Sequence, residues 1–161
     1  MSALKRRKSR IKHVVPIRTL EDSPKPLDRR LLTAYLQTAY RLLPLAVDLR
    51  INSPCPALDE WLEGHGANTL AVLTAWNPGS VLLPEAENQA RNLRLERTLL
   101  AHSTALLPAL GIRDAGDWPP EESFGAAGVS LQQAAELAAD FGQNAFVFAQ
   151  KGELVLLYWL R

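Results

Sequence analysis

The side chains best suited to binding or chemistry lie in three short segments that are far apart in the sequence. The first segment holds Trp76 and Asn77, and the last holds Gln143 and Asn144. An indole offers a flat apolar face and an amide both donates and accepts hydrogen bonds, which suits a planar or sugar-like ligand. The structural alternative is that asparagine before proline starts a turn, that the tryptophan covers a core, and that Asn144 ties a loop to a strand.

The middle segment contains Trp118 and two adjacent carboxylates, Glu121 and Glu122. Neighbouring residues of a strand point to opposite faces, so these two cannot easily flank one bond at the roughly 5 to 9 Å that glycosidases use. One of them alone could act as a base or bind a ligand hydroxyl. The nearby acids Asp114 and Asp117 do not have the spacing of a calcium loop.

Asn88, Arg91 and Asn92 lie one turn apart in a predicted helix. They could extend toward the same site, or they could form a solvated helix face. A phosphate at the start of this helix is disfavoured, because Glu85 and Glu87 occupy its first turns and would repel it.

Several common chemistries are absent from the sequence. It has no phosphate-binding glycine loop, no dinucleotide fingerprint, no nucleophile elbow and no His-Glu-x-x-His pair. Cys55 is the single cysteine, and the three histidines lack the spacing of zinc ligands. We therefore expect no metal and no cofactor, and we favour a protein that is not an enzyme.

The elements that must position these side chains follow from periodicity. Apolar alternation and turn signals predict strands at 69–76, 106–112, 123–129, 144–149 and 153–160. Helices are predicted from Pro84 to about Ala101 and after Ser130, which forms a capping box with Gln133 and precedes a C-terminal Gly142. The order β-α-β-β-α-β is the split β-α-β arrangement of ferredoxin-like folds. We expect an α/β (α+β) fold with a mainly antiparallel sheet.

That order has a geometric consequence for the candidate site. If the first strand runs up, three connections share the upper edge of the sheet, namely residues 76–80, 114–122 and 142–144. These are the three segments that hold the polar and aromatic side chains. The sequence therefore predicts that they meet at one rim, where a rigid sheet presents a binding site.

The fold begins near Leu27. Asp28 caps a predicted helix with apolar residues at 31, 35, 39 and 42, which Pro44 ends. An alternating strand is predicted over 45–51, and Pro56 opens a short helix through Trp61. A chain of 161 residues fits one domain, 27–161, after a disordered tail and linker over 1–26.

The tail differs in charge from the rest of the chain. The net charge is +1, yet the first twelve residues hold six cations and no acid, so the remainder is net negative. Such a tail binds polyanions by counterion release, or it is only a solvated end. The cations are Lys5, Arg6, Arg7, Lys8, Arg10 and Lys12.

Four short motifs resemble those of the bacterial family called domain of unknown function three-two-nine-three. In this order they span residues 74 to 149. The resemblance implies a bacterial origin, but it assigns no activity and no catalytic residue. The motifs are Thr74-Ala75-Trp76-Asn77-Pro78, Glu87-Asn88 with Arg91-Asn92, Trp118-Pro119 with Glu121-Glu122-Ser123, and Phe141-Gly142-Gln143-Asn144-Ala145.

The sequence thus favours a binding or regulatory module for a small polar molecule or a peptide. The alternatives are an enzyme with a lone carboxylate base and an accessory protein held on nucleic acid by the tail. No apolar run approaches the roughly 20 residues needed to span a bilayer, so we expect a cytoplasmic protein without membrane contact. The apolar final strand, 154–160, is expected at an unpaired sheet edge, which favours a homodimer.

Overall fold

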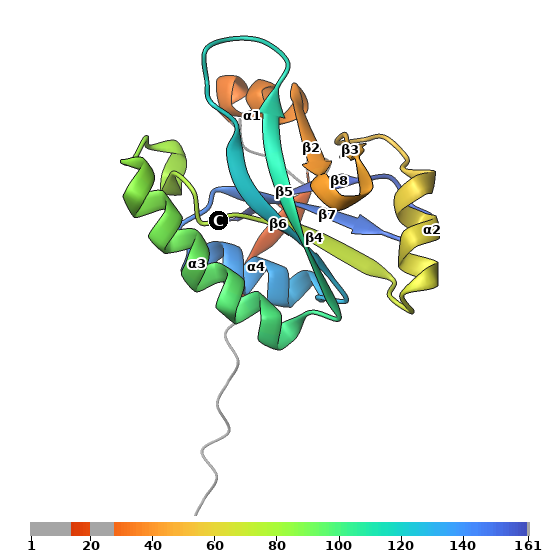
Figure 1. Ribbon diagram of the computed structural model, residues 1–161. Coiled ribbons are helices and arrows are strands. Elements are labelled where there is room, and N and C mark those ends of the chain that lie inside the picture. Colours follow the sequence, from red (N-terminus) through yellow and green to blue (C-terminus); the bar gives the residue numbers. More distant parts are fainter. Residues whose placement is uncertain (1–13, 20–27, 161) are drawn as a thin grey trace, which may run out of the picture.

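The computed structural model describes residues 14–19 and 28–160. These residues form four α-helices and one curled, antiparallel sheet of eight strands (Figure 1). The strands are β1 Ile17–Thr19, β2 Thr38–Leu42, β3 Val47–Leu49, β4 Thr69–Leu73, β5 Ala105–Arg113, β6 Glu121–Ala127, β7 Ala145–Gln150 and β8 Leu156–Leu160. The helices are α1 Arg29–Leu36, α2 Pro56–Gly64, α3 Glu85–His102 and α4 Leu131–Asp140.

The strand order across the sheet is β1-β8-β7-β4-β6-β5-β2-β3. From β4 onward the elements follow the order β4-α3-β5-β6-α4-β7-β8, as the periodicity of the sequence predicts. The four central strands, β7, β4, β6 and β5, are each antiparallel to their neighbours. The mixed α+β class with an antiparallel sheet is therefore confirmed.

Local signals explain where the later helices begin and end. Ser130 Oγ accepts from the backbone N–H of Gln133, and Gln133 Oε1 accepts from the backbone N–H of Ser130, which completes the predicted capping box. Gly142 follows α4 with φ of 72°, a left-handed conformation that glycine adopts without steric cost. Pro84 precedes α3 and Pro56 occupies the first turn of α2.

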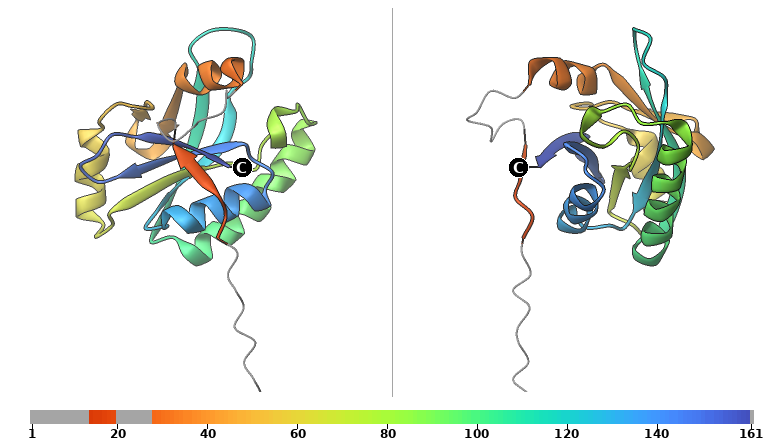
Figure 2. Two further views of the ribbon diagram at one scale, coloured as in Figure 1. Left: turned by 180° about the vertical axis from the view of Figure 1, so that it is seen from behind. Right: turned by 90° about the vertical axis from the view of Figure 1, so that its left-hand side faces the viewer.

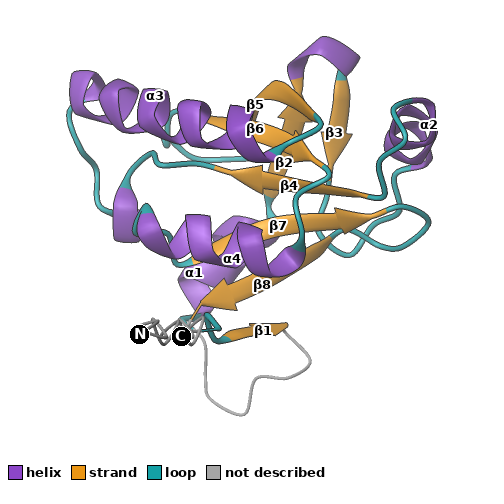
Figure 3. Cartoon of the chain, turned by 90° about the horizontal axis from the view of Figure 1, so that it is seen from below, coloured by secondary structure: helices purple, strands orange, loops and turns teal. Residues whose placement is uncertain are grey.

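The two faces of the sheet bury separate apolar cores. Leu95 and Leu99 of α3 and Ala134 and Ala138 of α4 pack on one face. The other face curls around a second core, which α2 and α1 help to close. Figure 3 shows α2 on the opposite side of the sheet from α3 and α4, and Figure 2 shows the curl from two further directions.

The first predicted helix is too long. Asp28 Oδ1 caps it as expected, but α1 ends at Leu36 and residues 38–42 form β2. β2 pairs with β5 through Tyr40 opposite Gly111 and with β3 through Tyr40 opposite Leu49. These long-range ladders override the helical spacing of the apolar residues, because tertiary pairing outweighs local propensity. The strand predicted over 45–51 is also too long. The structure has a 3-10 turn over Leu43–Leu45, and β3 covers only Val47–Leu49.

The expectation that the last strand lies at an open edge is wrong. β1 pairs with β8 in register Ile17 to Leu160, Arg18 to Trp159 and Thr19 to Tyr158. Residues 17–19 lie in the segment predicted as tail and linker, yet they add a strand that covers β8. β1 therefore occupies the edge of β8 along Tyr158 to Leu160, which removes the argument for a homodimer from an unpaired final strand.

The basic residues from Lys5 to Lys12 lie outside the described residues. Among the helices in 14–19 and 28–160, none has the length and apolar character needed to cross a bilayer.

Candidate functional site

The inner face of the curled sheet changes from apolar to polar toward the upper ends of β2, β5 and β6. Strand pairing places Tyr40, Gly111 and Glu121 in one row across these three strands. The next row holds Thr38 and Arg113, and the row below holds Ser123 beside Ala109. Residues two apart in a strand share a face, so all these side chains face the same space.

Gly111 leaves a hollow in the middle of this face. A Cβ atom added there would lie 3.7 Å from Thr38 Cγ2 and 4.0 Å from Tyr40 Cε1, which are ordinary contacts. The glycine is not needed to avoid a clash, and its φ is not left-handed. A glycine within a strand often marks a close approach by another group, and here it opens space between Tyr40 and Glu121.

A pocket of about 100 Å³ occupies this hollow. Its lining comes from the inner face of the sheet, from α1, from Ala138 of α4 and from the three connections at the rim. The lining combines apolar and polar side chains, as ligand pockets do. It consists of Leu31, Ala34, Tyr35, Thr38, Tyr40, Val72, Leu73, Thr74, Asn77, Ser80, Gly111, Arg113, Trp118, Glu121, Ser123, Ala138, Gln143, Ala145, Phe146 and Val147.

The carboxylate of Glu121 is held in a fixed position on the pocket wall. Asn77 Nδ2 donates to Glu121 Oε1 at 2.9 Å, and Trp118 Nε1 donates to the same oxygen at 3.0 Å. Within the described residues, no donor reaches Oε2. One oxygen is thus used to orient the group, while the other keeps its capacity to accept hydrogen bonds.

Arg113 lies beside this carboxylate as an unpaired cation. Its guanidinium carbon is 4.5 Å from the centre of the Trp118 ring, a cation–π geometry. Over 14–19 and 28–160, the guanidinium has no ion pair and no hydrogen bond, since the adjacent Asp114 is paired with Arg50 at 2.7 Å. The pocket therefore presents one cation and one carboxylate, and neither is neutralised by the other in a direct contact.

Asn77 and Asn88 form a buried network that supports Glu121. Asn77 has φ of 45° and accepts at Oδ1 from Asn88 Nδ2 and from the backbone N–H of Leu83. Asn88 Oδ1 in turn accepts from the backbone N–H of Asn77. Both side chains are at most 5% exposed. Asn77 lines the pocket, and both polar atoms of its side chain make hydrogen bonds to other residues, so it positions the carboxylate.

Two more side chains of α3 fasten the connection after β4. Asn92 Oδ1 accepts from the backbone N–H of Ala75 and Nδ2 donates to the carbonyl of Glu122. Arg91 donates to the carbonyls of Ala75 and Phe141. The alternative of a solvated helix face is therefore wrong for Asn88 and Asn92, which are buried. Asn88 and Arg91 tie the rim together and are not pocket residues.

The three connections predicted to share one rim do meet. The backbone N–H of Gly79 donates to the carbonyl of Gly142 at 2.8 Å, and Gln143 Nε2 donates to the carbonyl of Trp76. Asn144 Nδ2 donates to Ser80 Oγ, and the carbonyl of Asn144 accepts from Leu160. Gln143 lines the pocket, whereas Trp76 and Asn144 do not.

The two adjacent glutamates separate as strand alternation requires. Glu121 faces the pocket, while Glu122 is exposed and does not line it. Glu122 contributes its carbonyl, which accepts from Thr74 Oγ1 and Asn92 Nδ2. A pair of carboxylates acting on one bond is thus absent from this pocket.

Sequence reasoning missed half of the pocket. Burial raises the pKa of Tyr35 to about 12, with the charge of Glu121 adding to the rise and Arg113 opposing it. Burial also raises the pKa of Tyr40, so both rings are neutral. Ser123 is 7% exposed, and within the described residues its Oγ has no hydrogen-bond partner. The glycine inside a predicted strand, Gly111, was the signal that could have located this face.

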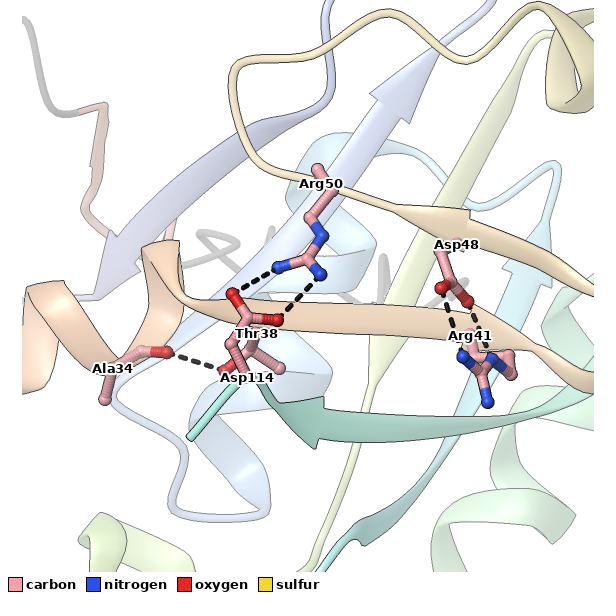
Figure 4. Close-up of polar contacts among 6 residues, drawn as sticks. All are labelled: Ala34, Thr38, Arg41, Asp48, Arg50 and Asp114. Carbon is pink, nitrogen blue, oxygen red and sulfur yellow. Dashed lines mark hydrogen bonds and ion pairs between the residues drawn. The ribbon is translucent and has the colours of Figure 1, made fainter. Parts of the chain in front are cut away.

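Helix α1 is attached to the rim at its C-terminal end. Thr38 Oγ1 donates to the carbonyl of Ala34, and the backbone N–H of Asp114 donates to the carbonyl of Gln37. Asp114 also accepts both guanidinium N–H groups of Arg50, as Figure 4 shows. A second ion pair, between Arg41 and Asp48, joins β2 to β3 in the same view. The hydrogen bonds to Ala34 and Gln37 hold the C-terminal end of α1 against β2 and β5, and the two ion pairs brace β3 against these strands.

Fold and site together define a mixed α+β protein with a pocket of apolar and polar side chains at the rim of a curled antiparallel sheet. Residues 73–146 match the family model described as Protein of unknown function (DUF3293). The match confirms the family resemblance inferred from the four motifs. It includes every rim connection, whereas Tyr35 and Tyr40 lie outside it. No curated protein and no solved structure matches the chain.

Proposed function

We propose that the protein binds a small polar molecule in the pocket beside Glu121. The observation that carries this proposal is the buried hydroxyl of Ser123, which lines the pocket and has no partner within the described residues. Leaving a buried polar group unpaired costs roughly 1 to 3 kcal/mol, and such groups in native proteins call for a specific explanation. A bound ligand supplies the missing partner.

The neighbouring groups support the same proposal. Two donors hold Glu121 Oε1, and Oε2 accepts no hydrogen bond from the described residues. Glu121 and Ser123 are two residues apart on β6 and share its pocket face. Tyr35 and Tyr40 give the pocket aromatic walls, and Gly111 gives it room. This combination of apolar walls with a few placed polar groups is typical of ligand sites.

A thermal-shift screen of a metabolite library tests the proposal. The screen uses wild type, Gly111→Leu, which fills the pocket, and Arg97→Gln, an exposed change on α3 that serves as a control. At a ligand concentration 100 times the dissociation constant, binding stabilises by about 2.7 kcal/mol. We expect stabilisation of wild type and the control, and none of Gly111→Leu. The proposal is contradicted if no compound stabilises wild type, or if every stabilising compound stabilises Gly111→Leu as much as wild type.

We also propose a more specific fold class for the central part of the sheet. We infer that the unit from β4 to β7 is a ferredoxin-like core, with β1, β8, β2 and β3 added at its two edges. The support is its element order together with the strand order β7-β4-β6-β5.

A further inference from the structure

We infer that the ligand of this pocket is amphoteric, with a cationic or hydroxyl donor for Glu121 and an acidic group for Arg113. An apolar amino acid is the simplest molecule of this class. The inference rests on the proposed function and names the chemistry of its ligand.

The first step is the charge of the pocket wall. Glu121 and Arg113 both line it, from adjacent antiparallel strands. Gly111 is opposite Glu121, and Arg113 is two residues further along the same strand, so Arg113 and Glu121 are diagonal neighbours on one face. Diagonal neighbours lie roughly 7 to 8 Å apart, a separation that lets their side chains reach opposite ends of one small molecule.

The second step is that neither charge is already satisfied. Both hydrogen bonds to Glu121 come from neutral groups, Asn77 and Trp118, and both reach Oε1. Arg113 contacts only the face of the Trp118 ring among the interactions of the described residues. Trp118 therefore holds the carboxylate through its N–H and the cation over its ring. It keeps the two charges at fixed places without letting them neutralise each other.

The third step is a second hollow that adjoins the first at Arg113. It measures about 190 Å³ and shares Ala34 and Arg113 with the first pocket. Arg30 of α1 adds a second cation there, and Thr33 and Gln37 add neutral polar groups. Among the residues that the structure describes, no carboxylate lines this hollow. The acidic end of a ligand is thus favoured toward Arg113 and Arg30, and its donor end toward Glu121.

The apolar part of the ligand also has a place. Leu31, Val72, Phe146 and Val147 line the pocket along with the two tyrosines. Burial of an apolar substituent against these groups removes apolar surface from water and so favours binding. A charged molecule without an apolar part would leave these walls unused.

The test compares the twenty proteinogenic amino acids with their N-acetyl and amide derivatives by calorimetry. Acetylation removes the ammonium group and amidation removes the carboxylate, while the side chain is unchanged. We expect at least one apolar amino acid to bind and each derivative to bind at least tenfold more weakly. In Glu121→Gln the N-acetyl form should bind as well as the free amino acid, while the amide should still bind more weakly. In Arg113→Gln the amide should bind as well as the free amino acid, while the N-acetyl form should still bind more weakly. Arg97→Gln is the control and should change neither.

Each contrary result has a separate meaning. Derivatives that bind as well as their parent amino acids overturn the amphoteric assignment. The assignment is also overturned if no amino acid binds but a library compound stabilises wild type and not Gly111→Leu. In that case the proposed function holds, and the pocket binds a ligand of another chemical class. If no compound of either set binds, both the assignment and the proposed function fail. Circular dichroism of each variant checks that a loss of binding is not a loss of fold.

Discussion

Asn77 and Glu121 join two connections of the sheet through one hydrogen bond, 2.9 Å from Nδ2 to Oε1. The backbone of Asn77 is left-handed, with φ of 45°, and its Oδ1 accepts from Asn88 and Leu83. Asparagine is among the few residues other than glycine that tolerate this conformation. The residue therefore has two separable roles, one in its backbone and one in its side chain.

Replacing Asn77 by glycine and by alanine separates these roles. Both changes remove the amide, so both should be less stable than wild type, but only alanine is strained by a positive φ, at roughly 1 kcal/mol. We expect Asn77→Ala to be about 1 kcal/mol less stable than Asn77→Gly in urea unfolding at neutral pH. An alanine variant as stable as the glycine variant would show that the left-handed backbone is not required.

Asn92 allows the cost of the rim network to be measured within one helix. Asn92→Leu removes the partners of Ala75 N–H and of the Glu122 carbonyl, and it should lower the free energy of unfolding by about 3 kcal/mol. The control is Gln89→Ala, whose exposed side chain bonds only Glu85. A surface change of this kind stays within about 0.5 kcal/mol. Similar stabilities of the two variants would mean that water replaces Asn92.

The buried tyrosines predict a loss of stability at alkaline pH. Below pH 10 Tyr35 is protonated in both folded and unfolded states and adds no pH dependence. Between pH 10 and about 12 the unfolded chain releases the phenolic proton while the folded chain keeps it, because burial raises the folded pKa to about 12. Stability should therefore fall as pH rises through this window, by about 3 kcal/mol in total for this group.

Urea unfolding of wild type and Tyr35→Phe at intervals from pH 9 to 11.5 measures this effect. Other titrating groups contribute equally to both proteins, so the difference between their slopes isolates Tyr35. Wild type should lose stability more steeply above pH 10. Parallel curves for the two proteins would contradict the assignment of Tyr35 to a buried, neutral site.

The helices and the rim follow from local signals in the sequence. Ser130 and Gln133 form their capping box, and Asp28 caps α1, because both interactions lie within one turn. The meeting of the three connections follows from the alternating direction of successive elements. The hydrogen bonds that join different elements, such as Asn77 to Asn88 and to Glu121, could not be predicted, because each of them joins residues at least 11 positions apart.

The inner wall of the pocket was not predictable for a different reason. Ala39 and Leu42 continue the helical spacing of Leu31 and Tyr35, so Tyr40 falls within the predicted helix. It becomes a strand residue only through its partners on β5 and β3. β1 is three residues long and gains its structure from pairing with β8. Both segments contain strand-favouring residues, but each is too short for its periodicity alone to distinguish a strand from a helix or a loop. The sequence therefore predicts the residues at the rim of the pocket but not the strand residues, such as Tyr40, that line its inner wall.

Two glycines in adjacent strands predict opposite responses to a larger side chain. A Cβ at Gly125 would lie 2.7 Å from Leu42 Cδ2, and Leu42 is fully buried, so it has no free space to move into. A Cβ at Gly111 meets nothing closer than 3.7 Å. Gly125→Val should destabilise by about 1 to 3 kcal/mol through overpacking. Gly111→Ala should be neutral or stabilising by up to about 1 kcal/mol, since it restricts the unfolded chain. Thermal unfolding of both variants beside wild type measures the contrast, and a destabilised Gly111→Ala would mean that the hollow beside Glu121 is filled.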